Sequence, residues 1–235
     1  MLITDFTFLN QPLQSLESAC IKINHSPLAF LAPIFNEGIE VIIVDCNSSD
    51  KTIDIAKIYR TNIYKSKKKN RGLQFNIGAN KAKGEWFIFI HADSRLNQDW
   101  LKKLKSVIGD QKNIIYFFKF KISNKKIIYR FLELLVNLRS FIFKNPYGDQ
   151  GLIIHRETYF KNKGYRKIPL MEDLDFTKRL KKNARLKMLN IPIYTSSRKW
   201  EKTNFIFQAF KNWNLRKRWL RGESIKSLYD DYYKK

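Results

Sequence analysis

Short apolar runs that alternate with amphipathic segments dominate the first half of the chain. Residues 86–90 are five consecutive apolar residues, which is typical of a strand buried on both faces of a sheet. Residues 41–44 form a second run of this kind. The segments between the runs have a helical period and begin with capping residues, so strand and helix alternate. This alternation predicts one α/β domain with a parallel sheet and right-handed crossovers.

The same signals predict the remaining elements. In the first half we expect further strands at 2–8 and 62–64, and helices at 12–23, 51–60 and 72–83. In the second half we expect strands at 114–122 and 152–155, helices at 127–143 and 171–182, and an ordered segment at 191–200. The helix at 127–143 is long and apolar, with Arg130 and Arg139 on its polar side.

The end of the first strand is ambiguous, because Pro33-Ile34-Phe35-Asn36-Glu37 also looks like the end of a strand. The next strand begins almost at once after it, and a parallel crossover needs a dozen or more residues. We therefore place the end of the first strand at Asn10 and interpret residues 25–38 as an inserted loop.

The composition is that of a folded protein with an unusual charge. The 235 residues are 44% hydrophobic and 14% aromatic, which is enough for one well-covered core. A formal net charge of +24 favours polyanionic partners, namely nucleic acid, an anionic membrane surface or phosphorylated substrates. Lysines spread over solvated faces would give the same total.

The cysteine count and the apolar runs limit where the protein works. Cys20 and Cys46 are too few for a disulfide scaffold, and no Cys/His cluster marks zinc, so a reducing, cytoplasmic setting fits best. No apolar run reaches the ~18 residues of a membrane span. Any contact with a membrane is therefore expected to be peripheral, on its inner face.

Both buried strands are followed by a carboxylate. Asp45 follows residues 41–44, and Asp93 follows residues 86–90 as part of His91-Ala92-Asp93. The carboxyl ends of parallel strands are where open α/β sheets bind ligands. The pair therefore predicts a nucleotide or metal–nucleotide site, and hence an enzyme.

Five stretches, in this order, resemble the motifs of the family 2 glycosyltransferases. They are IVDCNSSDKT at 43–52, RGLQFNIGA at 71–79, GEWFIFIHAD at 84–93, MED at 171–173 and SRKW at 197–200. The resemblance implies a GT-A (Rossmann-like) domain at residues 1–203, with a mostly parallel central sheet flanked by helices. A basic, aromatic, helical tail follows at 204–235.

The same resemblance implies an activity. The protein would transfer a sugar from a nucleotide-diphospho-sugar donor to an acceptor hydroxyl, with inversion and with the help of Mg²⁺ or Mn²⁺. The donor nucleotide is assigned to a set of polar residues, Asn10, Asp45, Asp50, Arg71, Asn76, Asp93 and Arg198. Three of them have a structural alternative: Asp45 as the cap of the turn after its strand, Arg71 as part of a solvated basic loop, and Asn76 as a residue held within the fold.

Asp93 is the expected metal ligand. Hard divalent cations that bridge a diphosphate take carboxylate oxygen and keep several waters. The resembled family commonly has Asp-x-Asp here, whereas this chain has His91 at the first position, which we interpret as a packing residue. Arg198 and the metal together would neutralise the leaving nucleotide diphosphate.

Glu172 and Asp173 open an amphipathic helix and contain the expected catalytic group. The acidic pair of the resembled family implies that Asp173, rather than Glu172, is the general base that deprotonates the acceptor hydroxyl. Stabilisation of the helix N-terminus is the structural alternative. Asp149 and Trp200 are candidates for contact with the acceptor, and for Asp149 a turn-forming role is the alternative.

The segment 204–221 interleaves aromatic and basic residues at helical spacing. This pattern suits a helix on anionic lipid, and it equally suits a helix that packs on the core with solvated cations. The acceptor is unassigned, and a lipid-linked hydroxyl is one candidate.

Two other functions are alternatives to sugar transfer. A nucleotidyltransferase could use the same sheet but normally has a Gly-rich signature after the first strand, where this chain has Asn10-Gln11-Pro12. A basic nucleic-acid-binding protein would explain the charge but not two buried strands that end in acids. We therefore expect no nucleic-acid partner.

Overall fold

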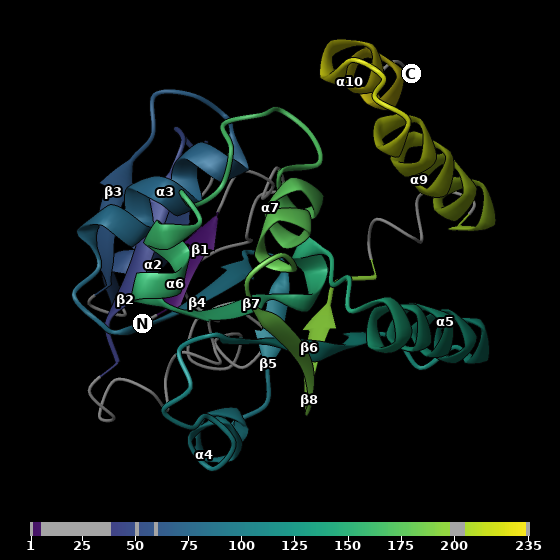
Figure 1. Ribbon diagram of the computed structural model, residues 1–235. Helices are drawn as coiled ribbons and strands as arrows, with labels where there is room; N and C mark the ends of the chain where they lie inside the picture. The colour runs from purple at the N-terminus through teal and green to yellow at the C-terminus, as the bar shows by residue number, and fades with distance from the viewer. Residues whose placement is uncertain (1, 6–38, 50–51, 59–60, 198–204, 234–235) are drawn as a thin grey trace, which may run out of the picture.

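The centre of the computed structural model is a sheet whose strands follow the order β3-β2-β1-β4-β7-β6-β8-β5 (Figure 1). The structure describes residues 2–5, 39–49, 52–58, 61–197 and 205–233. Its strands are β1 Leu2–Asp5, β2 Val41–Asp45, β3 Asn62–Lys65, β4 Trp86–His91, β5 Ser94–Leu96, β6 Ile114–Ile122, β7 Leu152–His155 and β8 Arg185–Thr195.

The sheet is mixed in direction. Strands β3, β2, β1 and β4 run parallel to one another, and β6 runs parallel to β8. Strand β7 is antiparallel to both of its neighbours, and β5 is antiparallel to β8. Four of the seven strand pairs described are parallel, so the prediction of a mostly parallel sheet is confirmed.

The first strand is shorter than expected. Strand β1 ends at Asp5, which pairs with Val44 on one side and His91 on the other. Asn10, the predicted helix at 12–23 and the whole predicted loop at 25–38 lie outside the described residues.

Helices flank the sheet and extend from it. They are α2 Thr52–Ile58, α3 Arg71–Lys81, α4 Trp100–Lys105, α5 Ile127–Phe143, the 3-10 helix η4 Gly148–Gln150, α6 Arg156–Lys161, α7 Glu172–Leu180, α9 Phe205–Leu220 and α10 Ile225–Tyr233. The predicted bounds of α5 are confirmed, and those of α3 and α7 differ by one or two residues at each end. Helix α3 begins at Arg71 because Asn70 caps it, accepting a hydrogen bond of 2.8 Å from the backbone N–H of Leu73.

Both faces of the sheet are covered, which explains the continuous apolar run of β4. Ile88 and Ile90 pack with Trp100 of α4 in one core cluster. Phe87 and Phe89 pack on the opposite face, in a cluster with side chains of α3, α6 and α7. A strand with helices on both faces has no polar side, as its sequence predicts.

The C-terminal tail is helical and packs against the start of α7. Leu215 of α9 and Leu228 of α10 are buried with Leu170, Met171 and Leu174. The aromatic side chains Phe207, Phe210 and Trp213 of α9 are exposed. The tail therefore packs through one face, while a lipid contact of its other face stays a prediction. In the described part of the chain, no helix is both long and apolar enough to cross a membrane.

Candidate active site

A cavity of about 220 Å³ lies at the carboxyl ends of β4 and β8. Its wall is formed by the sheet edge, residues 147–149 at the start of η4, the start of α7 and the C-terminal tail. The lining consists of Arg71, His91, Asp93, Tyr147, Gly148, Asp149, Leu170, Met171, Asp173, Leu174, Thr195, Ser196, Asn212, Leu215, Arg216 and Tyr232. This is the edge at which a parallel α/β sheet is expected to bind its ligand.

Part of the predicted site is brought together here. Four of the predicted residues line the cavity: Arg71, Asp93, Asp149 and Asp173. Asp45, Asn76 and Glu172 are described but do not line it. Asn10, Asp50, Arg198 and Trp200 lie outside the described residues, so their roles stay predictions.

Asp173 presents its carboxylate to the cavity from the first turn of α7. Its Oδ2 accepts a 2.8 Å hydrogen bond from the backbone N–H of Gly148, and its Oδ1 accepts one of 2.8 Å from that of Leu174. These two backbone donors fix the orientation of the carboxylate.

The backbone that leads into this turn is strained. Met171 precedes Glu172 with φ of +63°, a left-handed conformation that is costly for a residue with a side chain. Its side chain is buried with Leu215 and Leu228 of the tail. We infer that packing against α9 and α10 holds this conformation, and through it the position of Asp173.

Glu172 does not line the cavity, and its buried side chain makes an ion pair with Arg71. Its side chain is 2% exposed, and its Oε1 lies 2.7 Å from Nε of Arg71. Burial raises the pKa of Glu172, while the Arg71 guanidinium opposes that rise. The pair ties the first residue of α7 to the first residue of α3.

His91 and Gly148 are in close contact at the wall of the cavity. A Cβ at Gly148 would overlap Nε2 of His91 and lie 3.4 Å from Oδ2 of Asp173, so only glycine fits without a shift. The imidazole of His91 also meets the ring of Phe75 edge-on, with centroids 5.8 Å apart. His91 thus has packing contacts on two sides.

Asp149 has an oxygen atom without a partner. Its Oδ1 is buried and receives no hydrogen bond from the described residues. Burial raises the pKa of Asp149, with Arg139 opposing that rise. A buried acceptor at a cavity wall that finds no partner in the protein is suited to a hydroxyl donor on a ligand.

Arg216 and Tyr147 line the cavity and were not among the predicted site residues. The Tyr147 ring lies between two guanidinium groups, 3.4 Å from that of Arg139 and 4.5 Å from that of Arg216. The interleaved aromatic and basic residues of the tail were a visible signal, but the sequence did not show which of them reach the sheet edge.

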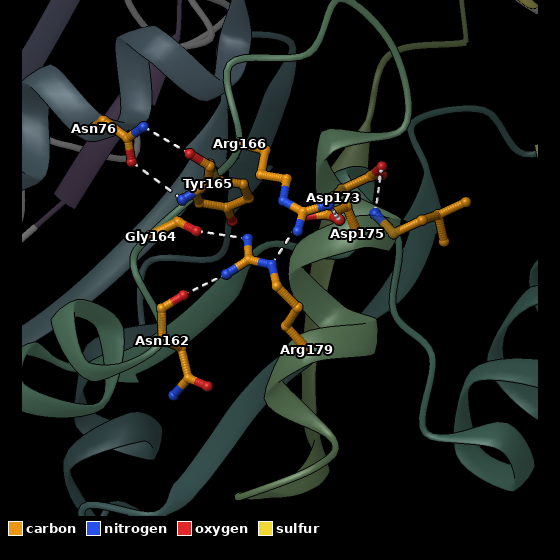
Figure 2. Close-up of polar contacts among 9 residues, drawn as sticks. Asn76, Asn162, Gly164, Tyr165, Arg166, Asp173, Asp175 and Arg179 are labelled. Carbon is orange, nitrogen blue, oxygen red and sulfur yellow. Dashed lines mark hydrogen bonds and ion pairs between the residues drawn. The ribbon is translucent and has the colours of Figure 1, made fainter. Parts of the chain in front are cut away.

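Asn76 is held within the fold, beside the loop at 162–166. Its Nδ2 donates a 2.7 Å hydrogen bond to the carbonyl of Tyr165, and its Oδ1 accepts one of 3.1 Å from the Tyr165 N–H (Figure 2). Arg179 of α7 donates to the carbonyls of Gly164 and Asn162 in the same loop. These bonds connect α3, the loop and α7. They occupy the side-chain amide of Asn76, which was expected to contact the donor nucleotide.

Asp45 is buried at the end of β2 and caps the turn that follows. Its Oδ2 accepts a 3.1 Å hydrogen bond from the backbone N–H of Ser48, and its carboxylate also accepts one from the Ser48 hydroxyl. Asn47 within this turn has φ of +52°, which Asn tolerates better than most residues. The structure thus contains the capping contact, and a nucleoside contact stays a prediction.

The residues at the cavity suit a cation that takes most of its ligands from the substrate and from water. No group of three His, Cys, Asp or Glu side chains placed to hold a metal occurs among the described residues. Asp93 contributes one exposed carboxylate at the cavity. Mg²⁺ commonly binds through one or two carboxylates, substrate phosphates and water, which this arrangement fits.

The mixed sheet, with acids at the carboxyl ends of its strands, agrees with the GT-A fold that the sequence resemblance implies. The model of the family described as "Glycosyl transferase family 2" matches residues 28–221, most of the chain. The chain belongs to this family. Family membership supports sugar transfer, the activity expected from the sequence.

Solved structures have the same fold. Residues 1–349 of TarS from S. aureus superpose with a TM-score of 0.61 at 20% identity, covering 83% of this chain and 60% of that chain. The mannosyltransferase PcManGT from Pyrobaculum calidifontis, in complex with GDP-Man and Mn²⁺, gives 0.58 at 14% identity, covering 92% and 60%. The chain thus spans about 60% of the length of these structures. No curated protein matched.

Proposed function

We propose that the protein transfers a sugar from a nucleotide-diphospho-sugar to an acceptor hydroxyl with inversion, and that Asp173 is the general base. The position of the Asp173 carboxylate carries this proposal. The carboxylate lines the cavity and accepts hydrogen bonds from two backbone N–H groups. The neighbouring Glu172 does not line the cavity and is paired with Arg71. Of the acidic pair, Asp173 is the one placed to meet a substrate.

The reaction would be a single displacement. A carboxylate oxygen of Asp173 accepts the proton of the acceptor hydroxyl as the hydroxyl oxygen bonds to the anomeric carbon. The bond from that carbon to the diphosphate breaks on the opposite face, and the nucleotide diphosphate leaves with the electron pair. Attack opposite to the leaving group inverts the anomeric configuration.

The leaving group would be held at the positive part of the cavity. Arg71 and Arg216 line it, and Asp93 is the residue that would hold Mg²⁺ or Mn²⁺. When bound, the cation would neutralise charge on the departing diphosphate. Complexes of TarS with UDP-GlcNAc and of PcManGT with GDP-Man and Mn²⁺ support this class of donor and a divalent metal.

The proposed acceptor is a molecule at a membrane surface. Asp149, with its unpartnered oxygen, and the predicted Trp200 would contact the acceptor, for which a lipid-linked hydroxyl is the candidate. We propose a cytoplasmic enzyme that works peripherally on the inner face of a membrane. The exposed aromatic side chains of α9 and the net charge of +24 support this location.

The test has two arms. Thermal shift with UDP- and GDP-sugars, each with Mg²⁺ or Mn²⁺, identifies the donor, since a ligand of the native state raises the melting temperature. NMR of the product from that donor then reports the anomeric configuration. Retention of configuration would refute the single displacement, and no shift or turnover with any nucleotide-sugar would refute the donor class.

A further inference from the structure

The side of α5 that faces the protein carries buried polar residues beside apolar contacts to β6. Its one acidic residue, Glu133, is buried and accepts a 2.6 Å hydrogen bond from the backbone N–H of Ile122 in β6. Asn137 is also buried, accepting 2.8 Å from the N–H of Phe120 and donating 2.9 Å to its carbonyl. Strand β7 pairs with β6 only at Tyr116, so these side chains of α5 satisfy backbone groups at the far end of β6.

The opposite face of α5 is apolar and exposed along its whole length. Residues at intervals of three and four positions share one side of a helix, so they form a continuous stripe. The stripe consists of Ile127, Phe131, Leu134, Leu138, Phe141 and Ile142. Ile127 is 87% exposed and Leu134 is 61% exposed. The 17 residues of α5 make a stripe about 25 Å long at about 1.5 Å per residue.

A helix whose outer side meets water normally exposes polar side chains, whereas α5 exposes an apolar stripe. An exposed apolar patch of this extent marks an interaction site. The helix extends away from the sheet, beyond β6 (Figure 1). Within the described part of the chain, nothing covers these six side chains.

The charges around the stripe select its partner. Lys125 and Lys126 are exposed just before α5, and Lys144 follows it with its Nζ 4.2 Å from the centroid of the Phe141 ring. No exposed acid lies on the helix. An anionic lipid surface complements apolar side chains framed by lysines. A second copy of the same face would instead bring lysines against lysines.

We propose that α5 lies in the interface of an anionic bilayer, with its apolar stripe inserted among the lipids. The inner side of α5 contacts the turn that forms the cavity: the Ser140 hydroxyl donates 2.6 Å to Oε1 of Gln150, and Arg139 stacks on Tyr147. Docking therefore brings the cavity close to the membrane. The inference gives the proposed membrane partner a definite docking element.

The experiment is vesicle co-sedimentation of the full chain. Vesicles of phosphatidylcholine, with and without phosphatidylglycerol, are compared at low and high NaCl. The test variant carries Phe131→Ser, Leu134→Ser and Leu138→Ser. The comparison variant carries Phe207→Ser, Phe210→Ser and Leu220→Ser, three similarly exposed apolar residues of α9, the other helix that is proposed to face the membrane. A loss of vesicle binding at least as large in the α9 variant as in the α5 variant would overturn α5 as the docking element.

We expect the wild type to bind anionic vesicles, less so at high salt, because the lysine contribution is screened. The affinity of the α5 variant for the vesicles should fall by about tenfold or more, since three inserted apolar side chains are lost. Wild-type affinity in the α5 variant, or no binding by the wild type, would overturn the inference. So would a wild-type dimer in light scattering that the α5 variant converts to a monomer, because a second copy would then cover the stripe.

The outcome is separable from that of the proposed transfer. The substituted α5 side chains are exposed, so circular-dichroism melts of the variant should match those of the wild type. Thermal shift by the nucleotide-sugar is measured without lipid. Loss of vesicle binding with this shift intact isolates the docking role, whereas absence of the shift in the wild type refutes only the transferase proposal.

Discussion

Nε of Arg71 lies 2.7 Å from Oε1 of Glu172, and this ion pair joins the start of α3 to the start of α7. Both residues were expected to meet substrate, one as a donor contact and the other as a possible base. Their pairing instead gives Glu172 a positioning role, because it fixes the helical turn from which Asp173 faces the cavity. It also places the partly exposed Arg71 guanidinium at the cavity wall.

Glu172→Gln should impair transfer without removing the general base. The substitution removes the negative charge that faces the Arg71 guanidinium, so the turn from which Asp173 faces the cavity is held less firmly. Because burial raises the pKa of Glu172, loss of its charge also relieves a desolvation cost, and the stability of the fold should change little. Turnover with the donor found by thermal shift should fall, while urea denaturation should show a variant about as stable as the wild type. Glu157→Gln, which breaks the exposed pair with Lys112, is the matched control and should leave both measurements unchanged. Equal turnover by the two variants would contradict a positioning role for Glu172.

Asp173→Asn should abolish transfer and leave the donor site intact. An amide oxygen can still accept the hydrogen bond from Gly148 N–H, but it cannot take the proton, so kcat should fall by about 10²–10⁴-fold. The assay is turnover with the donor found by thermal shift, and the donor-induced shift itself should persist. Asp99→Asn, which changes an exposed acid at the start of α4, is the control. Substantial turnover by a folded Asp173→Asn variant would exclude the general-base assignment.

Much of the fold could be predicted because its signals are local. Strands β2 and β4 are continuous apolar runs buried on both faces, and α5 has a clear helical period. Strand β8 begins at Arg185, six residues before the ordered segment expected at 191–200, because its first residues include exposed Arg185 and Lys187 and form no continuous apolar run. Strand β5, with three residues, and the one-and-a-half-turn helices α4 and α6 are too short to produce a periodic signal.

The cavity could be predicted only in part, for a different reason. The acids at strand ends are positioned by the sheet, so Asp93 could be placed from its own neighbourhood. Arg216 reaches the cavity through the packing of α9 on the start of α7, which depends on contacts distant in sequence. The periodicity of α5 likewise identifies an apolar side and a polar side, but not which of them faces the protein.

Gly148→Ala should damage the site through His91. The added methyl group would overlap Nε2 of His91, and overpacking of this kind typically costs about 1–3 kcal/mol. In a His91→Ala background the obstruction is gone, so the cost of Gly148→Ala should largely disappear. A double-mutant cycle on the free energy of unfolding measures this coupling. Additive effects of the two substitutions would show that His91 is not what restricts position 148.

Asp149→Asn should stabilise the free protein at neutral pH. Burial raises the pKa of Asp149 above its ordinary value of 3.8, so the folded state binds its proton more tightly than the unfolded state does. The stability that this proton contributes is fully present below pH 3.8 and is lost as the pH rises through the folded pKa. As the pH rises the wild type loses this contribution, whereas Asn binds no proton and its stability does not depend on it, so the advantage of the variant should shrink as the pH falls toward 4. Melting temperatures of both proteins across this range measure the difference, and a difference independent of pH would contradict burial of the charge.

If the unpartnered oxygen of Asp149 also meets the acceptor, the more stable variant should show a higher KM for the acceptor with an unchanged thermal shift by the donor.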